Sequence, residues 1–105
     1  MKEITAQELR RIMAAGEKIM ILDVREPYET EYCGIGGHCL PMSQLLDRLP
    51  EIPRDRPVVV HCNSGNRSSA VIDSLCCRYG YTNLINLKGG IAAWQAEVDP
   101  QLRCE

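Results

Sequence analysis

The 105-residue chain has no phenylalanine and one tryptophan, and aromatic residues make up only 5% of it. A hydrophobic core must therefore be built from Ile, Leu, Val, Met and Ala, and an apolar content of 45% is enough for a globular protein. Only two histidines are present, and no spacing between histidine and cysteine is typical of a zinc site. We therefore expect neither a metal nor another cofactor.

Long apolar runs and an excess of positive charge are also missing. No apolar run approaches the length of a membrane-spanning helix, and the first segment, MKEITAQEL, lacks the hydrophobic stretch of a signal peptide. A formal net charge of −2 gives no basis for binding nucleic acid or an acidic membrane surface. These absences predict a cytoplasmic protein without nucleic-acid or membrane partners.

Cysteine is the residue present in excess, with six in the chain. Short secreted proteins use such cysteines for a disulfide framework, but no secretion signal is visible and the apolar pattern already provides a core. Cys76 and Cys77 are adjacent within a helical pattern. We therefore expect no disulfide framework, and we expect Cys39 and Cys76 to be buried as small apolar side chains.

The length and the order of the apolar patterns predict one α/β domain over residues 1–105, with its core at about 4–97 and a short C-terminal tail. A capping box formed by Thr5 and Glu8 begins the first helix, and Gly16 is expected to end it. Strands are predicted at 19–22, 58–61 and 84–87, and further helices at 26–32, 41–49, 68–79 and 91–97. Strands that alternate with helices imply an open, mainly parallel sheet flanked by helices on both faces.

The stretch VVVHCNSGNRSSAV at 58–71 is the most informative part of the chain. Cys62 follows a buried strand and precedes a polar loop that leads into a helix at about Ser68. Loop amides and a helix N-terminus both favour an anion, so the thiol is predicted to ionise readily and to act as a nucleophile. Asp23 and the Gly89–Gly90 turn are also predicted at carboxyl ends of strands, where open parallel sheets bind ligands.

Four residues separate Cys62 from Arg67, one fewer than in the similar loop of cysteine phosphatases, and the tighter loop suits a sulfur carried on cysteine better than phosphate. This loop, with DVREP at 23–27 and LKGGIAAW at 87–94, resembles the rhodanese family of sulfurtransferases. The resemblance runs from about Ile4 to Trp94. It implies a rhodanese-like fold and transfer of sulfane sulfur from a donor such as thiosulfate, through a Cys62 persulfide, to a thiol or protein acceptor.

Specific roles follow for the loop and for the DVREP motif. Cys62 and Arg67 are the expected catalytic residues. Arg67 is expected to stabilise the persulfide, to pair with a carboxylate such as Asp23, or to do both. Asp23 and Arg25 are expected to support the site, with Arg25 either at the pocket mouth or solvated. The loop expected to bind substrate and persulfide comprises Asn63, Ser64, Gly65, Asn66, Arg67 and Ser68.

Three further features bear on this assignment. His61 is expected to point away from Cys62, because adjacent residues of a strand face opposite sides of a sheet. Asn63 stands where many relatives carry arginine directly after the cysteine, which weakens the case for thiosulfate as the preferred donor. Residues 33–41 also depart from the G-H-I-P-G-A pattern of the family, so the strand near Cys39 is predicted to be shorter or differently bent.

Three functions remain as hypotheses. The first is the sulfurtransferase described above. The second is a phosphatase or arsenate reductase on the same scaffold, against which the four-residue spacing argues. The third is a non-catalytic interaction module or a sulfur carrier that depends on a protein partner. The physiological donor and acceptor, the pathway and the oligomeric state are left open, as is any part of Cys33, Cys39 or Cys104 in sulfur relay or in disulfides.

Overall fold

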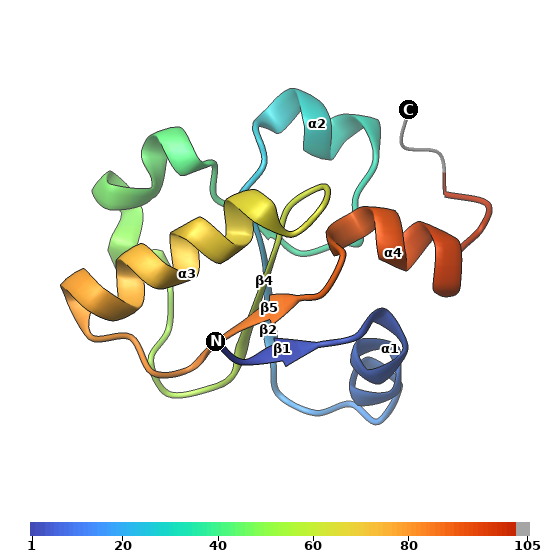
Figure 1. The fold of residues 1–105 in the computed structure, drawn as a ribbon, viewed down its shortest axis with the longest axis horizontal. Coiled ribbons are helices and arrows are strands. Elements are labelled where there is room, and N and C mark those ends of the chain that lie inside the picture. The colour runs from blue at the N-terminus through green and yellow to red at the C-terminus, as the bar shows by residue number, and fades with distance from the viewer. Residues whose placement is uncertain (103–105) are drawn as a thin grey trace.

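The computed structural model describes residues 1–102, without the side chain of Tyr32. Its strands pair in parallel in the order β1-β5-β4-β2-β3. They are β1 (Glu3–Ile4), β2 (Met20–Asp23), β3 (His38–Cys39), β4 (Val58–His61) and β5 (Leu84–Leu87). The predicted open parallel sheet with helices on both faces is confirmed (Figure 1).

Helical segments connect the strands and cover the sheet. They are α1 (Ala6–Ala14), α2 (Pro27–Tyr32), the 3-10 helix η1 (Met42–Glu51), α3 (Asn66–Tyr79) and α4 (Gly90–Glu97). The predicted capping box is present at α1, since the Thr5 side chain accepts from the Glu8 amide and Glu8 accepts from the Thr5 amide. No helix within residues 1–102 has the length and apolar character needed to cross a membrane.

Side chains alternate across the central strand β4 and so supply a separate core on each face of the sheet. Val60 packs in one cluster with Leu75 of α3. Val59 packs in the other cluster with Leu9 of α1 and Trp94 of α4. In Figure 1, α3 and η1 (green) accordingly lie to the left of the sheet, and α1 and α4 lie to its right.

Several boundaries differ from those predicted. β1 is an edge strand of two residues, too short to show an alternating pattern in the sequence. The helix predicted at 41–49 is a 3-10 helix that reaches Glu51, with Arg48 outside helical geometry and Pro50 inside the segment. α3 begins at Asn66 rather than at Ser68. β3 consists of two residues, in agreement with the prediction of a shortened strand.

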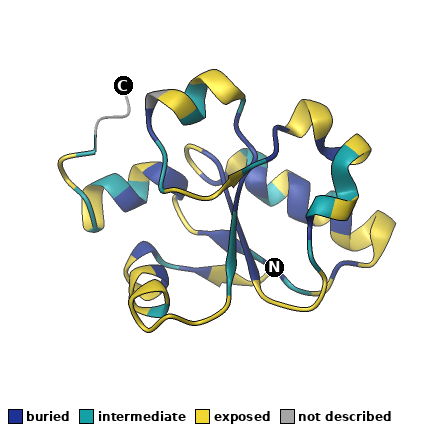
Figure 2. Ribbon diagram, turned by 180° about the vertical axis from the view of Figure 1, so that it is seen from behind, coloured by how far each residue is buried: buried dark blue, intermediate teal, exposed yellow. Residues whose placement is uncertain are grey.

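The prediction that Cys76 is buried is wrong. The buried residues of α3 are Ser68, Val71, Ile72 and Leu75, whereas residues 76–80 are all exposed. The last turn of α3 therefore stands clear of the core, and helical periodicity no longer selects a buried face there (Figure 2). Cys39 is half-buried rather than fully buried.

Candidate functional site

The carboxyl ends of three neighbouring strands bring the predicted site residues to one edge of the sheet. Asp23 ends β2, Cys62 directly follows β4, and the Gly89–Gly90 turn follows β5. The register of β2 and β4 places Asp23 beside His61. The loop after Cys62 then leads into α3 (Figure 1).

The sulfur of Cys62 is surrounded by hydrogen-bond donors of its own loop. The amide of Gly65 lies 3.1 Å from Sγ, the amide of Ser68 lies 3.4 Å away, and the Ser68 hydroxyl oxygen lies 3.5 Å away. Gly65 has a φ of +99°, a left-handed conformation that glycine adopts without strain. Inward-facing amides of this kind form a binding site for an anion.

These donors outweigh the effect of burial on the thiol. Cys62 is only 1% exposed, and burial by itself would raise its pKa. Hydrogen bonds that the thiolate can accept from the Ser68 hydroxyl and from the amides of Ser68, Gly65 and Ser64 act in the opposite direction, so that the pKa of Cys62 lies below its ordinary value. The geometry therefore supports an activated thiol.

The N-terminus of α4 fixes the loop from outside. The amide of Ile91 donates to the Cys62 carbonyl at 2.9 Å, and that of Ala92 donates to the Asn63 carbonyl at 3.0 Å. A carbonyl and the N–H of the same planar peptide unit point in opposite directions. Holding these two carbonyls outward therefore turns the amides of Asn63 and Ser64 inward. The LKGGIAAW motif thus supports the loop through its backbone.

Gly90 cannot accept a side chain without moving this loop. A Cβ at Gly90 would lie 2.5 Å from the Cys62 carbonyl oxygen, and the φ of Gly90 is +61°. Gly90→Ala should therefore lower the free energy of unfolding by more than the roughly 1–2 kcal/mol of left-handed strain. It should also slow the alkylation of Cys62, because the loop amides are displaced. Urea denaturation and peptide-resolved iodoacetamide kinetics measure the two effects.

Gly36→Ala is the matched control for this substitution. Gly36 has a φ of +82°, but a Cβ there would meet no atom within 4 Å. Gly36→Ala should lower the free energy of unfolding only by the left-handed strain, and it should leave the alkylation of Cys62 unchanged. Equal losses of stability in both variants, with no change in Cys62 reactivity, would show that α4 does not hold the loop.

Arg67 pairs with a carboxylate that the sequence analysis did not single out. Its Nη1 and Nη2 atoms lie 2.7 and 2.8 Å from the two carboxylate oxygens of Glu29 in α2. Hydrogen bonding within this pair raises the pKa of Arg67 and lowers that of Glu29. The suggested pairing with Asp23 is wrong, because α2 passes beside the loop and Asp23 is occupied elsewhere. The Arg67 side chain remains 38% exposed.

Arg25 is neither at a pocket mouth nor solvated. Its Nε and Nη2 donate to the two carboxylate oxygens of Asp23 at 3.0 and 2.7 Å, and Nη2 also donates to the Cys33 carbonyl at 2.6 Å. The side chains of Arg25 and Asp23 are 2% and 3% exposed. Burial by itself would raise the pKa of Asp23, but the hydrogen bonds and the charge of Arg25 lower it overall. This pair joins the end of β2 to the end of α2 beneath the site.

Strand alternation assigns the His61 side chain to the face of β4 opposite to Val60, which shares a cluster with Cys62. His61 is fully buried, and neither ring nitrogen has a hydrogen-bond partner among residues 1–102. Its Nε2 lies 3.9 Å from Asp23 Oδ2. Burial lowers the pKa of His61, so the imidazole is neutral at neutral pH.

The remaining candidate residues occupy different environments. Asn63, Ser64 and Asn66 are exposed at the outer side of the loop. Cys39 lies beside Thr30, with 3.5 Å between Sγ and Oγ1, and Cys104 lies outside the described residues. One further residue of the site, Asn86 of β5, was assigned from the sequence only to a strand. It is a buried polar residue that contacts Ser68.

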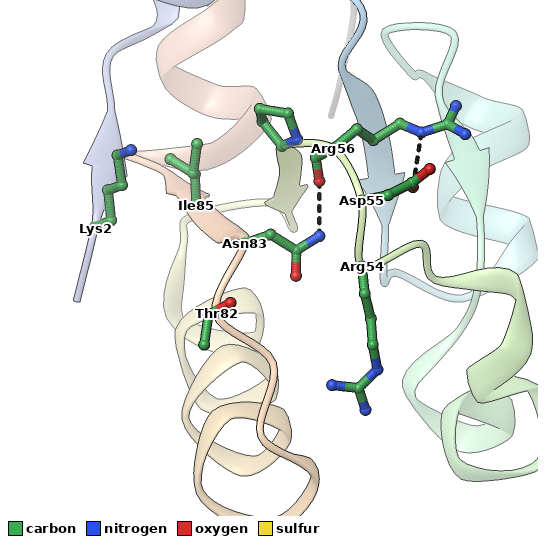
Figure 3. A pocket seen from close by; sticks show the side chains of 8 residues that line it. Lys2, Arg54, Asp55, Arg56, Thr82, Asn83 and Ile85 are labelled. Atoms are coloured by element: carbon green, nitrogen blue, oxygen red, sulfur yellow. Dashed lines mark hydrogen bonds and ion pairs between the residues drawn. The ribbon is translucent and has the colours of Figure 1, made fainter.

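A separate hollow of about 310 Å³ lies at the opposite edge of the sheet, at the amino ends of β4 and β5 (Figure 3). Lys2, Arg54 and Arg56 are among its lining residues. The Arg54 guanidinium lies 3.8 Å from the centre of the Tyr81 ring, and Arg56 Nε lies 3.5 Å from Asp55 Oδ1. The three cationic side chains point in different directions in Figure 3 and do not converge on one anion.

Within residues 1–102, no group of three or more His, Cys, Asp or Glu side chains is arranged to hold a metal ion. The chemistry available at the site is therefore that of the Cys62 thiol, the loop amides, the Ser68 hydroxyl and the Arg67–Glu29 pair. A buried thiolate held by amides is suited to attack a soft electrophile such as sulfur.

Comparison with known proteins gives matches over nearly the whole chain. Residues 5–97 match the rhodanese-like domain family. A "Sulfurtransferase" of Allochromatium vinosum is 39% identical over 93 residues, which are 88% of this chain and 86% of that protein. The crystal structure of a rhodanese-related protein from Thermoplasma volcanium matches with a TM-score of 0.83 and 31% identity over 100% of both chains. The "Probable adenylyltransferase/sulfurtransferase MoeZ" of Mycobacterium tuberculosis is 32% identical over 102 residues, which are 94% of this chain but 26% of MoeZ.

Proposed function

Because the chain belongs to the rhodanese-like domain family, we propose that it is a sulfurtransferase that carries sulfane sulfur as a persulfide on Cys62. The family and the relatives named sulfurtransferases support sulfur transfer as the general activity. The observation that carries the finer proposal is the set of donors around Sγ, with the Gly65 amide at 3.1 Å and the Ser68 amide at 3.4 Å.

The proposed reaction has two displacement steps. The Cys62 thiolate attacks the outer sulfur of the donor, a bond to this sulfur forms, and the donor's S–S bond breaks. The leaving group departs with the electron pair and is sulfite when the donor is thiosulfate. An acceptor thiolate then attacks the outer sulfur of the persulfide, and the bond to Sγ breaks to restore the Cys62 thiolate. Loop amides stabilise the negative charge throughout.

The charges around the loop favour a donor whose reacting group carries little charge. Arg67 is already paired with Glu29, and Asn63 supplies no cation. A dianion such as thiosulfate would therefore meet a guanidinium whose charge is largely neutralised. Persulfides of small thiols or of proteins do not need that cation. We therefore propose a persulfide donor, with thiosulfate used more slowly.

Intact-mass spectrometry tests this function directly. The protein is incubated with thiosulfate or with glutathione persulfide, and each sample is then treated with cyanide. A gain of about 32 Da that cyanide removes would show one transferable sulfur atom. Peptide mapping then identifies the cysteine that carries it. Folded protein that gains no sulfur from either donor would contradict the proposed function.

Neutralising Glu29 should widen the choice of donor. Glu29→Gln keeps the shape of the side chain but removes the charge that opposes a bound anion. Loading with thiosulfate should become about three- to tenfold faster, the scale of one partly exposed charge interaction of about 1 kcal/mol. Loading with glutathione persulfide should change much less. Initial rates of sulfur gain for the two donors give the comparison.

Glu31→Gln is the control for this prediction, because Glu31 is an exposed carboxylate of the same helix. It should leave both loading rates unchanged. If Glu29→Gln slows loading with both donors equally, the Arg67–Glu29 pair holds the loop in shape and does not select the donor.

A sulfur carrier that depends on a protein partner is the second candidate. Two observations favour it: Cys62 is only 1% exposed, and the chain spans 26% of MoeZ. Such a carrier would form the Cys62 persulfide but pass its sulfur slowly to every small acceptor. Fast turnover with cyanide or glutathione as acceptor would exclude this candidate. Hydrolysis of an aryl phosphate that depends on Cys62 would instead indicate a phosphatase.

A further inference from the structure

A buried polar network stands directly behind the sulfur of Cys62. The hydroxyl oxygen of Ser68 lies 3.5 Å from Sγ and 2.6 Å from Oδ1 of Asn86. Nδ2 of Asn86 lies 3.5 Å from the Gly65 carbonyl oxygen. Ser68 and Asn86 are both buried, so solvent does not replace these partners. The network joins the active loop to strand β5.

The Ser68 hydroxyl has one proton and three acceptors within reach. Asn86 Oδ1 is at 2.6 Å, the Gly65 carbonyl oxygen is at 3.2 Å and Cys62 Sγ is at 3.5 Å. The shortest contact belongs to Asn86, so its amide oxygen receives the proton. The opposite orientation of this amide would place Oδ1 against the Gly65 carbonyl, and two acceptors would then face each other.

This orientation of the Ser68 hydroxyl favours the thiol over the thiolate, whereas the loop amides of Gly65 and Ser68 favour the thiolate. With its proton directed to Asn86, the Ser68 oxygen presents a lone pair to Sγ and accepts from an S–H group. When the thiol loses its proton to solvent, the hydroxyl must rotate to donate to Sγ, and Oδ1 of Asn86 is left buried without this donor. In a persulfide the negative charge lies on the outer sulfur, so Ser68 can keep its bond to Asn86.

We propose that Asn86 is a positioning residue that competes with Cys62 for the hydroxyl proton of Ser68, and thereby disfavours the free thiolate relative to the persulfide. The inference rests on the proposed function in that Cys62 is the residue that carries the sulfur. It assigns to β5 an influence on the reacting atom that is exerted through Ser68.

The pH dependence of Cys62 alkylation tests this inference. Asn86→Leu removes the competing acceptor at similar size, so the midpoint of the profile should fall by about 0.5 to 1 pH unit. Asn86→Asp provides a stronger, charged acceptor, so the midpoint should rise. Peptide-resolved rates with iodoacetamide separate Cys62 from the exposed thiols of Cys76 and Cys77.

Ser68→Ala is the matched background, because it removes the proton for which the two groups compete. In this background Asn86→Leu should leave the midpoint unchanged. If Asn86 merely packs behind the loop, Asn86→Leu would raise the midpoint, or it would shift the midpoint equally with and without the Ser68 hydroxyl. Either result would overturn the inference. If Asn86→Leu fails to fold, Asn86→Asp provides the test. A midpoint that does not rise in Asn86→Asp would also overturn the inference.

The alkylation experiment uses no sulfur donor, so its result is independent of the sulfur-loading experiment. Shifted midpoints without any sulfur gain would reject the proposed function while the competition for the Ser68 proton stands. Sulfur gain with midpoints that do not respond to Asn86 would reject this inference alone.

Discussion

Replacing Cys62 by serine should abolish the gain of about 32 Da from any sulfane donor and reduce sulfur transfer at least about a thousandfold. The serine hydroxyl does not ionise near neutral pH and cannot carry a sulfur that an acceptor removes. The loop amides would still converge on the position of Oγ, since their orientation is fixed by the backbone bonds from Ile91 and Ala92. Intact-mass spectrometry and steady-state transfer to cyanide measure the loss.

Cys76→Ser is the matched control, because Cys76 is a free thiol of the same chain that lies on the exposed last turn of α3. It should keep full sulfur loading. The unfolding curve of Cys62→Ser should remain cooperative, which separates loss of chemistry from loss of fold. A Cys62→Ser protein that still gains one cyanide-labile sulfur would reject Cys62 as the carrier.

Asp23→Asn should cause the second large effect, a loss of about 3–5 kcal/mol in the free energy of unfolding. The substitution preserves shape but leaves the guanidinium of Arg25 buried without its countercharge. Asp23 also accepts from the Arg25 amide at 3.0 Å and from the Thr30 hydroxyl at 3.0 Å, so it connects β2 with α2. Because stabilities of small domains are about 5–15 kcal/mol, this loss would be severe. Urea denaturation measures it.

Asp55→Asn is the control, since Asp55 pairs with Arg56 at 3.5 Å while its side chain is 78% exposed. An exposed pair contributes at most about 1 kcal/mol, so this variant should unfold nearly as the wild type does. If Asp23→Asn and Asp55→Asn lower the free energy of unfolding by similar small amounts, the Asp23–Arg25 pair contributes little to stability.

The effect of Asp23→Asn should depend on pH in one direction. The folded-state pKa of Asp23 lies below its ordinary value of 3.8, so the stabilisation is fully present above that value. It is lost as the pH falls through the folded-state pKa, because the protonated carboxyl also leaves Arg25 unpaired. The difference in the free energy of unfolding between the wild type and Asp23→Asn should therefore become smaller in acid.

The parts of the fold that could be predicted are those specified by neighbouring residues. The Thr5–Glu8 capping box and the apolar run that forms β4 each depend on a few consecutive positions. The order of strands and helices also restricts the sheet to parallel pairing. The edge strand β1 was missed because two residues cannot display an alternating pattern.

The parts of the site that could not be predicted depend on residues far apart in the chain. Glu29 is 38 positions from Arg67, and Asn86 is 18 positions from Ser68. A glutamate in the first turn of a helix and a polar residue in a strand have ordinary local explanations. Only the packing of α2 and β5 against the loop shows what they contact.

The sequence by itself determined the family, the class of fold and the place of Cys62 in a loop after a buried strand, because loop conformation and strand ends are encoded locally. The tertiary structure decided the charges and protons around the Cys62 thiol. It paired Arg67 with Glu29, buried Arg25 on Asp23 and directed the Ser68 hydroxyl to Asn86. The physical reason is that hydrogen bonds and ion pairs act over a few ångströms in space, and distance along the chain does not indicate which side chains come that close.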